Sequence, residues 1–256
     1  MTALMTLWER DIIRFFRDKP RVIGGLVPPI VFWFLIGTGL GTSVRVPGAP
    51  EDLSFLQYFY AGTLVLIVLF TSIFATISII EDRREGFLQA VLVAPVSRLS
   101  IVLGKVMGAS TVGLAQGLAF LLLAGAAGLH PGFHGYALAF AVLTLASVGL
   151  TGLGFCIAWV LDSSQGFHAV MNLFLIPMWM LSGALFPAAA APRFLRAVIA
   201  LNPVAYSVTG LQRALLPSVV AQDSASMGAC LAILAAFAAL MLTLSVFVAS
   251  RRTHDI

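Results

Sequence analysis

Residues 106–160 read VMGASTVGLAQGLAFLLLAGAAGLHPGFHGYALAFAVLTLASVGLTGLGFCIAWV and contain no Asp, Glu, Lys or Arg. A helix needs about 20 apolar residues to cross the hydrocarbon core of a bilayer, so this stretch is too long for one crossing. The segment HPGFHG at residues 130–135 contains the residues that end helices and supplies a natural boundary. The stretch therefore predicts two membrane-spanning helices.

The composition of the whole chain agrees with a membrane protein. Of its 256 residues 60% are apolar and 10% are charged, whereas an ordinary soluble domain is about 25% charged. Too few polar residues remain to cover a soluble protein of this size. We therefore expect residues 1–256 to form one all-α polytopic membrane domain, in which Pro177 kinks the fifth span. The six predicted spans cover about residues 22–41, 58–80, 101–128, 136–161, 168–188 and 227–249.

The positions of Lys and Arg predict the orientation of the chain. Five precede the first span, four lie between residues 83 and 105, and two follow the last span, so eleven share one side. The other four lie on the opposite side: Arg45, Arg193, Arg196 and Arg213. Cytoplasmic loops carry the excess of basic residues, so both termini are expected in the cytoplasm. As a separate expectation, we place the chain in the inner (cytoplasmic) membrane of a bacterium. Short basic clusters between apolar runs do not indicate nucleic-acid binding.

The first 21 residues are too charged to be a span. Wound as a helix, residues 4–18 place apolar side chains, including Trp8 and Phe15, on one face and Arg10, Arg14 and Arg17 on the other. This pattern predicts a helix that lies in the headgroup plane, with its arginines reaching anionic lipid or a cytoplasmic partner. The alternative is a surface helix packed on a soluble domain.

The segment 189–226 is too apolar for a free loop, yet prolines interrupt it. A full span here would place the C-terminus outside, so we predict short helices that dip into the outer leaflet. The alternative is a small helical cap in water. The candidate functional residues of this re-entrant segment are Asn202, Pro203, Tyr206 and Arg213.

The sequence lacks the motifs of several classes of enzyme and binding site. No G-x-x-x-x-G-K-[ST] or H-E-x-x-H pattern is present, so we expect no catalytic, cofactor or metal site on the chain. The spans contain no ionisable residue in their interiors, which disfavours an ion-coupled carrier. Their mild polar side chains are expected to hold helices together. The pairs Gly104/Gly108 and Gly113/Gly117 would let another helix approach the third span closely.

The strongest local signal is EDRREGFLQAVLVAPVSR at residues 81–98. A charged cluster leads into a short amphipathic helix that a proline ends. A plain cytoplasmic loop would need no ordered apolar face, so we predict a coupling helix that docks into a groove of a soluble partner. Its candidate contact residues are Glu81, Arg83, Arg84, Glu85, Gly86, Phe87, Leu88, Val91, Leu92 and Pro95.

This segment, with Leu103-Gly104-Lys105, resembles the coupling region of type-2 ABC exporter permeases, the group that includes drug-resistance and nodulation-factor export subunits. The family often has Thr and Glu where this chain has Phe87 and Gln89. Two further stretches are similar to family motifs: Leu201-Asn202-Pro203-Val204-Ala205-Tyr206 with Leu211-Gln212-Arg213, and Leu181-Ser182-Gly183-Ala184-Leu185-Phe186-Pro187. The resemblance covers essentially the whole chain.

The resemblance implies half of an ATP-driven exporter. Two permease chains, expected to be a homodimer, would form the pore, and two separate ATPase subunits would bind beneath them and carry ATP and magnesium. The uncharged span interiors favour a hydrophobic or amphipathic substrate. Two other functions stay open at this stage: a membrane scaffold or assembly factor that does not transport, and an ion-coupled secondary carrier.

Overall fold

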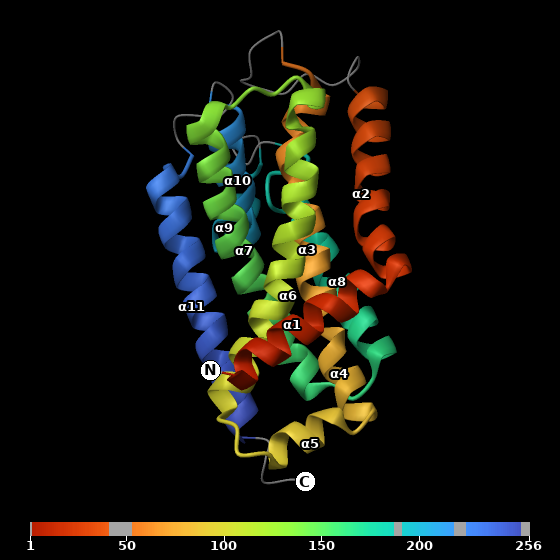
Figure 1. The fold of residues 1–256 in the computed structure, drawn as a ribbon. Helices are drawn as coiled ribbons and strands as arrows, with labels where there is room; N and C mark the ends of the chain where they lie inside the picture. Colours follow the sequence, from red (N-terminus) through yellow and green to blue (C-terminus); the bar gives the residue numbers. More distant parts are fainter. Residues whose placement is uncertain (1, 41–52, 187–190, 218–223, 252–256) are drawn as a thin grey trace.

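A computed structural model describes residues 2–40, 53–186, 191–217 and 224–251. All regular secondary structure in its described part is helical, and the helices form one elongated bundle (Figure 1). The elements are α1 (Thr2–Arg17), α2 (Lys19–Leu40), α3 (Phe55–Ala75), α4 (Ile77–Arg84), α5 (Phe87–Val93), α6 (Arg98–Leu121), the 3₁₀ helix η1 (Leu122–Ala127), α7 (Gly132–Val160), α8 (Ser164–Met180), α9 (Arg193–Leu201), α10 (Pro203–Leu215) and α11 (Met227–Arg251).

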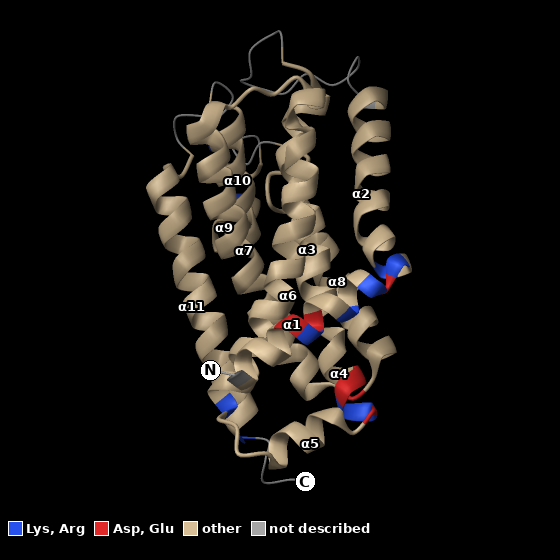
Figure 2. Cartoon of the chain, in the orientation of Figure 1, with Lys and Arg blue, Asp and Glu red and all other residues tan. Residues whose placement is uncertain are grey.

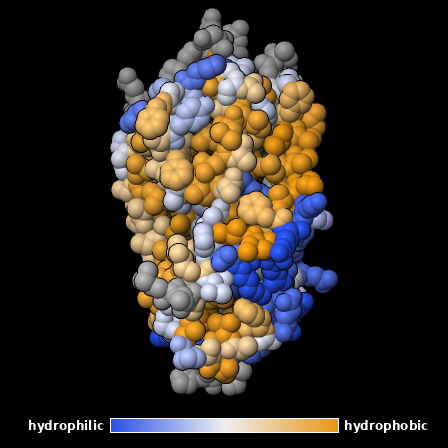
Figure 3. Space-filling model, viewed as in Figure 1, coloured by the Kyte–Doolittle hydropathy of each residue, from blue (hydrophilic) through white to orange (hydrophobic). Residues whose placement is uncertain are grey.

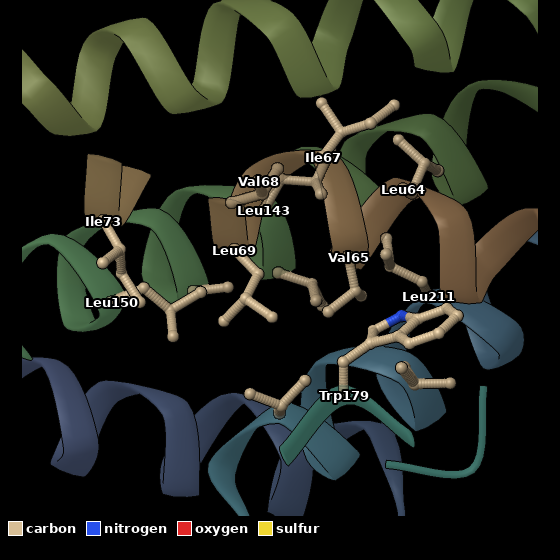
Figure 4. Packing of buried hydrophobic residues seen from close by; sticks show 14 of the residues in the cluster. Leu64, Val65, Ile67, Val68, Leu69, Ile73, Leu143, Leu150, Trp179 and Leu211 are labelled. Atoms are coloured by element: carbon tan, nitrogen blue, oxygen red, sulfur yellow. The ribbon is translucent and has the colours of Figure 1, made fainter. Parts of the chain in front are cut away.

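Helix α3 is the centre of the bundle. It packs against α2, α6, α7, α8 and α10, and its side chains are buried on every face. Figure 4 shows Leu64, Val65 and Leu69 of α3 among residues of its neighbours, with Trp179 of α8 beside them. A helix that is apolar all round is stable only when other elements or lipid cover it, and here the other helices do so.

The outer helices turn apolar side chains outward. On α2, Ile23, Val27 and Leu35 are exposed, as are Leu240 and Phe247 on α11. A soluble protein rarely exposes such a continuous apolar surface, so this surface fits contact with lipid. Five described helices are long and apolar enough to cross a membrane, or six if the bent pair α9–α10 counts as one. The all-α polytopic membrane fold predicted from the sequence is confirmed.

The fifth predicted span differs most from the helix found, and α8 is not among the five described helices that are long and apolar enough to cross a membrane. The fifth was expected over residues 168–188, but α8 begins at Ser164 and ends at Met180. Residues 187 and 188 lie outside the described residues, as does residue 41 of the first predicted span. The helix ends early because residues 181–186 form a turn in which Gly183 adopts a positive φ of 85°, a conformation that favours glycine.

Polar side chains inside the bundle join neighbouring helices, as predicted. The Thr71 hydroxyl donates to Gln116 Oε1 at 2.6 Å, and the Gln116 amide donates to the carbonyl of Val22 at 3.1 Å. The hydroxyls of Ser72 and Ser147 lie 2.9 Å apart. These contacts connect α2, α3, α6 and α7.

Charged residues gather at one end of the bundle. Figure 2 shows most described Lys, Arg, Asp and Glu residues around α1, α4, α5 and the start of α2, while the upper parts of the helices are largely uncharged. In space-filling view these residues form a hydrophilic patch below an apolar surface (Figure 3). Helix α1 and the end of α11 lie at this same end.

Candidate functional site

Helices α1, α4 and α6 meet at the charged end of the bundle. Close approach of α1 to α6 is possible because α6 carries Gly104 and Gly108. A Cβ atom at Gly104 would lie 2.9 Å from Leu7 Cβ, and one at Gly108 would lie 3.0 Å from Asp11 Cβ. The predicted close packing at this glycine pair is confirmed, and its partner is α1.

Asp82 of α4 is the centre of this contact. Its side chain is fully buried, and its carboxylate accepts hydrogen bonds from three cationic side chains. Arg10 donates through Nη1 at 3.0 Å and Nη2 at 2.7 Å, and Arg14 through Nη1 at 2.8 Å. The Lys105 ammonium of α6 forms a close ion pair with the same carboxylate. One α4 carboxylate therefore holds α1 and α6 together.

Asp11 of α1 completes a cluster with these four residues, which we call the base cluster: Arg10, Asp11, Arg14, Asp82 and Lys105. The Asp11 carboxylate lies 3.0 Å from Lys105 Nζ, and the Lys105 side chain is only 2% exposed. Burial raises the pKa of Asp11 above its usual range, and the Lys105 ammonium opposes that shift. The cluster thus places three cations against two carboxylates.

Two glutamates of the 81–98 segment surround the base cluster. Arg14 Nη2 lies 3.2 Å from a Glu81 carboxylate oxygen and 3.1 Å from one of Glu85. Arg21, at the start of α2, lies 3.7 Å from Glu81 and donates to the carbonyl of Phe74 at 2.8 Å. These partly exposed pairs are individually weak, but together they connect α1 and α2 to α4.

The two arginines of this segment bind the end of α7 rather than a free surface. Arg83 donates to the carbonyls of Trp159 and Leu161 at 2.7 and 3.1 Å, and to Asp162 Oδ1 at 2.7 Å. Arg84 donates to the carbonyl of Asp162 at 3.0 Å. Carbonyls at a helix C-terminus have no partner within their own helix, so Arg83 caps α7 and ties it to α4.

The predicted coupling helix is α5, with bounds that differ from the predicted loop. Residues 81–84 continue α4 as helix, and Gly86 makes the turn into α5 with a positive φ of 78°. Pro95 follows the end of α5 and is exposed. The Arg10 guanidinium lies 3.7 Å from the centre of the Phe87 ring, so α5 also contacts α1.

The prediction of which α5 residues form an exposed apolar docking face is partly wrong. Leu88 is only 3% exposed and belongs to the main hydrophobic core of this chain. Val91 and Leu92 are half-buried, whereas Gln89, Ala90 and Val93 are exposed, Val93 by 86%. The helix turns Leu88 inward because α4 and α5 cover the bundle end. Gly86, Gln89, Ala90 and Val93 form one exposed face, which we call the α5 face.

The predicted orientation of the first helix is also partly wrong. Arg10 and Arg14 were expected to reach lipid or a partner, but both turn inward because Asp82 is buried beneath them. Arg17 is exposed, as expected, and Phe15 is buried. The Trp8 indole donates to the Thr111 hydroxyl of α6 at 3.1 Å. Helix α1 therefore packs against its own bundle through Arg10 and Arg14 as well as through Phe15.

The segment 189–226 forms two short helices, α9 and α10, that meet at 89°; residues 189–190 and 218–223 of it lie outside the described residues. Asn202 caps α10, which begins with Pro203, and its side-chain amide donates to the carbonyls of Met178 and Leu181 at 2.6 and 3.0 Å. It thereby satisfies carbonyls at the C-terminal end of α8. Tyr206 donates to Ala200 at 2.8 Å, and Arg213 donates to the carbonyl of Ala225 at 2.7 Å.

Sequence reasoning missed the acidic centre of the site. Asp11 and Asp82 were not among the candidate residues, and Lys105 was used only to orient the chain and as part of the Leu103-Gly104-Lys105 resemblance. The spans were expected to hold no ionisable residue in their interiors; Lys105 lies near the start of α6, at the charged end of the bundle, and is nevertheless buried, with 3% exposure. Its only signal was one lysine at the start of an otherwise uncharged span. Which carboxylates neutralise it depends on helices that are distant in sequence.

Comparisons with known proteins agree with this architecture. A family model described as "ABC-2 type transporter" matches residues 2–216. The chain is 29% identical over 209 residues to the "Putative transport permease ycf38" of Cyanophora paradoxa, covering 80% of this chain and 71% of that protein. It is 26% identical over 222 residues to "Nodulation protein J" of Rhizobium leguminosarum bv. viciae, covering 85% and 83%. It is 27% identical over 222 residues to the "Inner membrane transport permease YadH" of Escherichia coli K12, covering 82% and 81%.

The family match includes the base cluster, the α5 face and the α9–α10 pair, and it spans well over half of the chain. The relatives are named as transport permeases or as a nodulation protein, and each alignment covers most of both proteins. The motif resemblance noted in the sequence is therefore confirmed at the level of the family. This chain belongs to the family of ABC-2 type transporters and is a membrane permease of that family.

Proposed function

We propose that this chain is the membrane-spanning subunit of an exporter powered by two separate ATPase subunits, which bind at the α5 face. ATP and magnesium would be held by those subunits. Two permease chains, as a homodimer, would surround the path of a hydrophobic or amphipathic substrate. The observation that carries the proposal is the combination of an exposed α5 face with the base cluster directly behind it.

The ion pairs explain how a push on α5 would reach the rest of the bundle. Helix α5 follows α4 after a single turn, and α4 is bonded to α1 and α6 through Asp82 and to α7 through Arg83. A short helix connected in this way cannot move alone. Closure of an ATPase dimer against α5 would therefore shift α1, α4, α6 and α7 as one group, which is the kind of rigid coupling that alternating access requires.

Val93→Asp is expected to weaken binding of the ATPase without loss of the folded permease. Docking would bury the Val93 side chain, which is worth roughly 1.5 kcal/mol or about tenfold in affinity. The substitution itself should not destabilise the folded chain, because Val93 is 86% exposed. Co-purification of the permease with its ATPase measures the effect.

Phe133→Asp is the matched control for that variant, because Phe133 is 90% exposed and lies in the first turn of α7, away from α5. It should retain the ATPase at wild-type level. Equal retention by the Val93 and Phe133 variants would contradict docking at the α5 face. Failure of the wild-type chain to bind any ATPase would contradict the exporter proposal and favour a scaffold.

The proposed orientation places α5 in the cytoplasm and the start of α7 outside. In a background carrying Cys156→Ala and Cys230→Ala, we expect Val93→Cys to react with an impermeant thiol reagent only after the cells are opened. Phe133→Cys should react in intact cells. Both sites are exposed, so accessibility to reagent depends on the side of the membrane. Labelling of both residues from the same side would refute the orientation.

A further inference from the structure

Helix α9 lies near the end of the bundle that is away from the base cluster. The Tyr58 hydroxyl of α3 donates to the carbonyl of Gly183 at 2.8 Å, and the Trp179 indole of α8 donates to the carbonyl of Gly62 at 2.8 Å. The C-terminal end of α8 therefore lies beside the first two turns of α3, which rise about 10 Å. Asn202 attaches the end of α9 to this end of α8. Amphipathic helices at a membrane interface reach a similar depth, about 5–10 Å below the headgroups.

Only one face of α9 packs against the described part of the bundle. Ile199 forms a small core with Ala191 and Ala205, separate from the main core, and Leu195 packs against it. Helix α9 meets α10 at 89°, so it does not continue α10 across the bilayer. The remaining two faces of α9 are free to contact something other than these residues.

The second face of α9 is apolar and exposed. Its residues have the spacing i, i+3, i+4, i+7, which places them on one side of a helix. Phe194 is 72% exposed and Leu201 is 87% exposed, and exposed apolar surface that is continuous marks a binding surface or a membrane contact. We call this face the α9 stripe: Phe194, Ala197, Val198 and Leu201.

The third face of α9 carries Arg193 and Arg196 along one edge of the α9 stripe. Both are exposed, and residues three apart on a helix are surface neighbours, about 5–6 Å between their Cβ atoms. Neither has a carboxylate partner in the described part of the chain, where the acidic residues all belong to the charged end (Figure 2). Arg213 on α10 differs, because it donates to the carbonyl of Ala225 and to Ser224.

We propose that the α9 stripe and its two arginines bind a phospholipid of the leaflet away from the base cluster. The acyl chains cover the stripe, and the phosphate lies between Arg193 and Arg196. A guanidinium binds phosphate through two parallel hydrogen bonds, and the long arginine stem lets the charge reach the headgroups while its methylene groups stay in the apolar layer. The proposal concerns lipid contact and goes beyond the proposed export function.

The two other possible occupants of this surface fit it less well. Water would leave the whole α9 stripe exposed to solvent. A second copy of the chain, related by a two-fold axis through the stripe, would bring the same surface against itself. That contact would place Arg193 and Arg196 near their own copies, with no carboxylate of the described residues on either side to compensate them. A phospholipid supplies both the apolar contact and the negative charge.

Fluorescence quenching of a bimane group on Val198→Cys tests what covers the stripe. The full-length chain, with Cys156→Ala and Cys230→Ala, is placed in phosphatidylcholine vesicles that hold iodide on both sides. We expect brominated acyl chains to quench Val198→Cys as strongly as Leu240→Cys, an exposed position on α11, and iodide to quench it far less than Val93→Cys on α5. Quenching by iodide alone would show a surface in water, and quenching by neither would show a protein contact; either result would overturn the proposal.

The same label tests whether the arginines select phosphate. Brominated phosphatidylcholine competes with digalactosyldiacylglycerol, which has similar chains and no phosphate; neither lipid carries net charge. We expect phosphatidylcholine to be preferred about fivefold at Val198→Cys and not to be preferred at Leu240→Cys. The pair Arg193→Gln and Arg196→Gln should abolish that preference. The pair Arg17→Gln and Lys19→Gln, which changes exposed basic residues at the charged end, should leave it intact.

Absence of the preference in the wild-type chain, or its survival without Arg193 and Arg196, would refute phosphate binding at α9. These measurements need neither ATP nor an ATPase, so they separate this proposal from the proposed function. A chain without lipid preference that still co-purifies with its ATPase would refute the lipid site alone. A chain that binds phospholipid at α9 but recruits no ATPase would refute the exporter proposal alone.

Discussion

Asp82→Asn is expected to destabilise the folded chain by about 3–5 kcal/mol, because it removes the charge that compensates three cations at a buried site. Lys105 would suffer most, since its side chain is 2% exposed and cannot reach water without moving α1. The free energy of unfolding in detergent measures the loss. Protease should also cleave α1 of the variant faster than α1 of wild type, because α1 is held to α4 through this carboxylate.

Asp162→Asn is the control for that effect. Asp162 forms an ion pair with Arg83 at 2.7 Å, yet its side chain is 73% exposed. Exposed pairs are worth about 1 kcal/mol or less. If the two substitutions lowered the free energy of unfolding equally, burial of the base cluster would not explain the contribution of Asp82 to stability.

Leu88→Asp is expected to abolish accumulation of folded chain. Truncation of a buried leucine to alanine already costs about 2–5 kcal/mol, and a carboxylate at this 3% exposed position adds the cost of desolvating a charge. Size-exclusion chromatography of a fluorescently tagged chain would show aggregated or missing protein. Val93→Asp, which introduces the same charge five residues later at an exposed site, should elute as wild type does.

The contrast between these two positions is the sharpest test of how α5 is oriented. The sequence placed Leu88 on a docking face, which would make Leu88→Asp a folded permease that has lost its ATPase. The structure makes it a core residue, so loss of folding should precede any loss of the partner. A folded Leu88→Asp chain that fails only in ATPase binding would restore the docking interpretation.

The errors in the sequence-based prediction have a common cause. For α1 and α5, the amphipathic pattern was visible, but the partner of each face was not. The arginines of α1 were assigned to lipid or a partner because they lie on the helix face opposite the apolar side chains. Asp82 lies 72 residues after Arg10, and only packing of α4 under α1 brings the two together. Likewise, Leu88 is buried whereas Val93, five residues later, is exposed. The packing of α5 beside α4 decides which of the two faces the core.

The sequence by itself determined the membrane class, the order of the long helices and the presence of a break near residue 130, and it predicted a coupling segment. These follow from local quantities: the length of apolar runs, the spacing of charges and the placement of Gly and Pro. Only the tertiary structure decided that Asp82 binds Arg10, Arg14 and Lys105, that Leu88 is core, and that α9 exposes an apolar stripe beside two arginines. Those features depend on which helix faces meet, and that is set by packing and charge compensation between residues far apart in the chain, which no local pattern records.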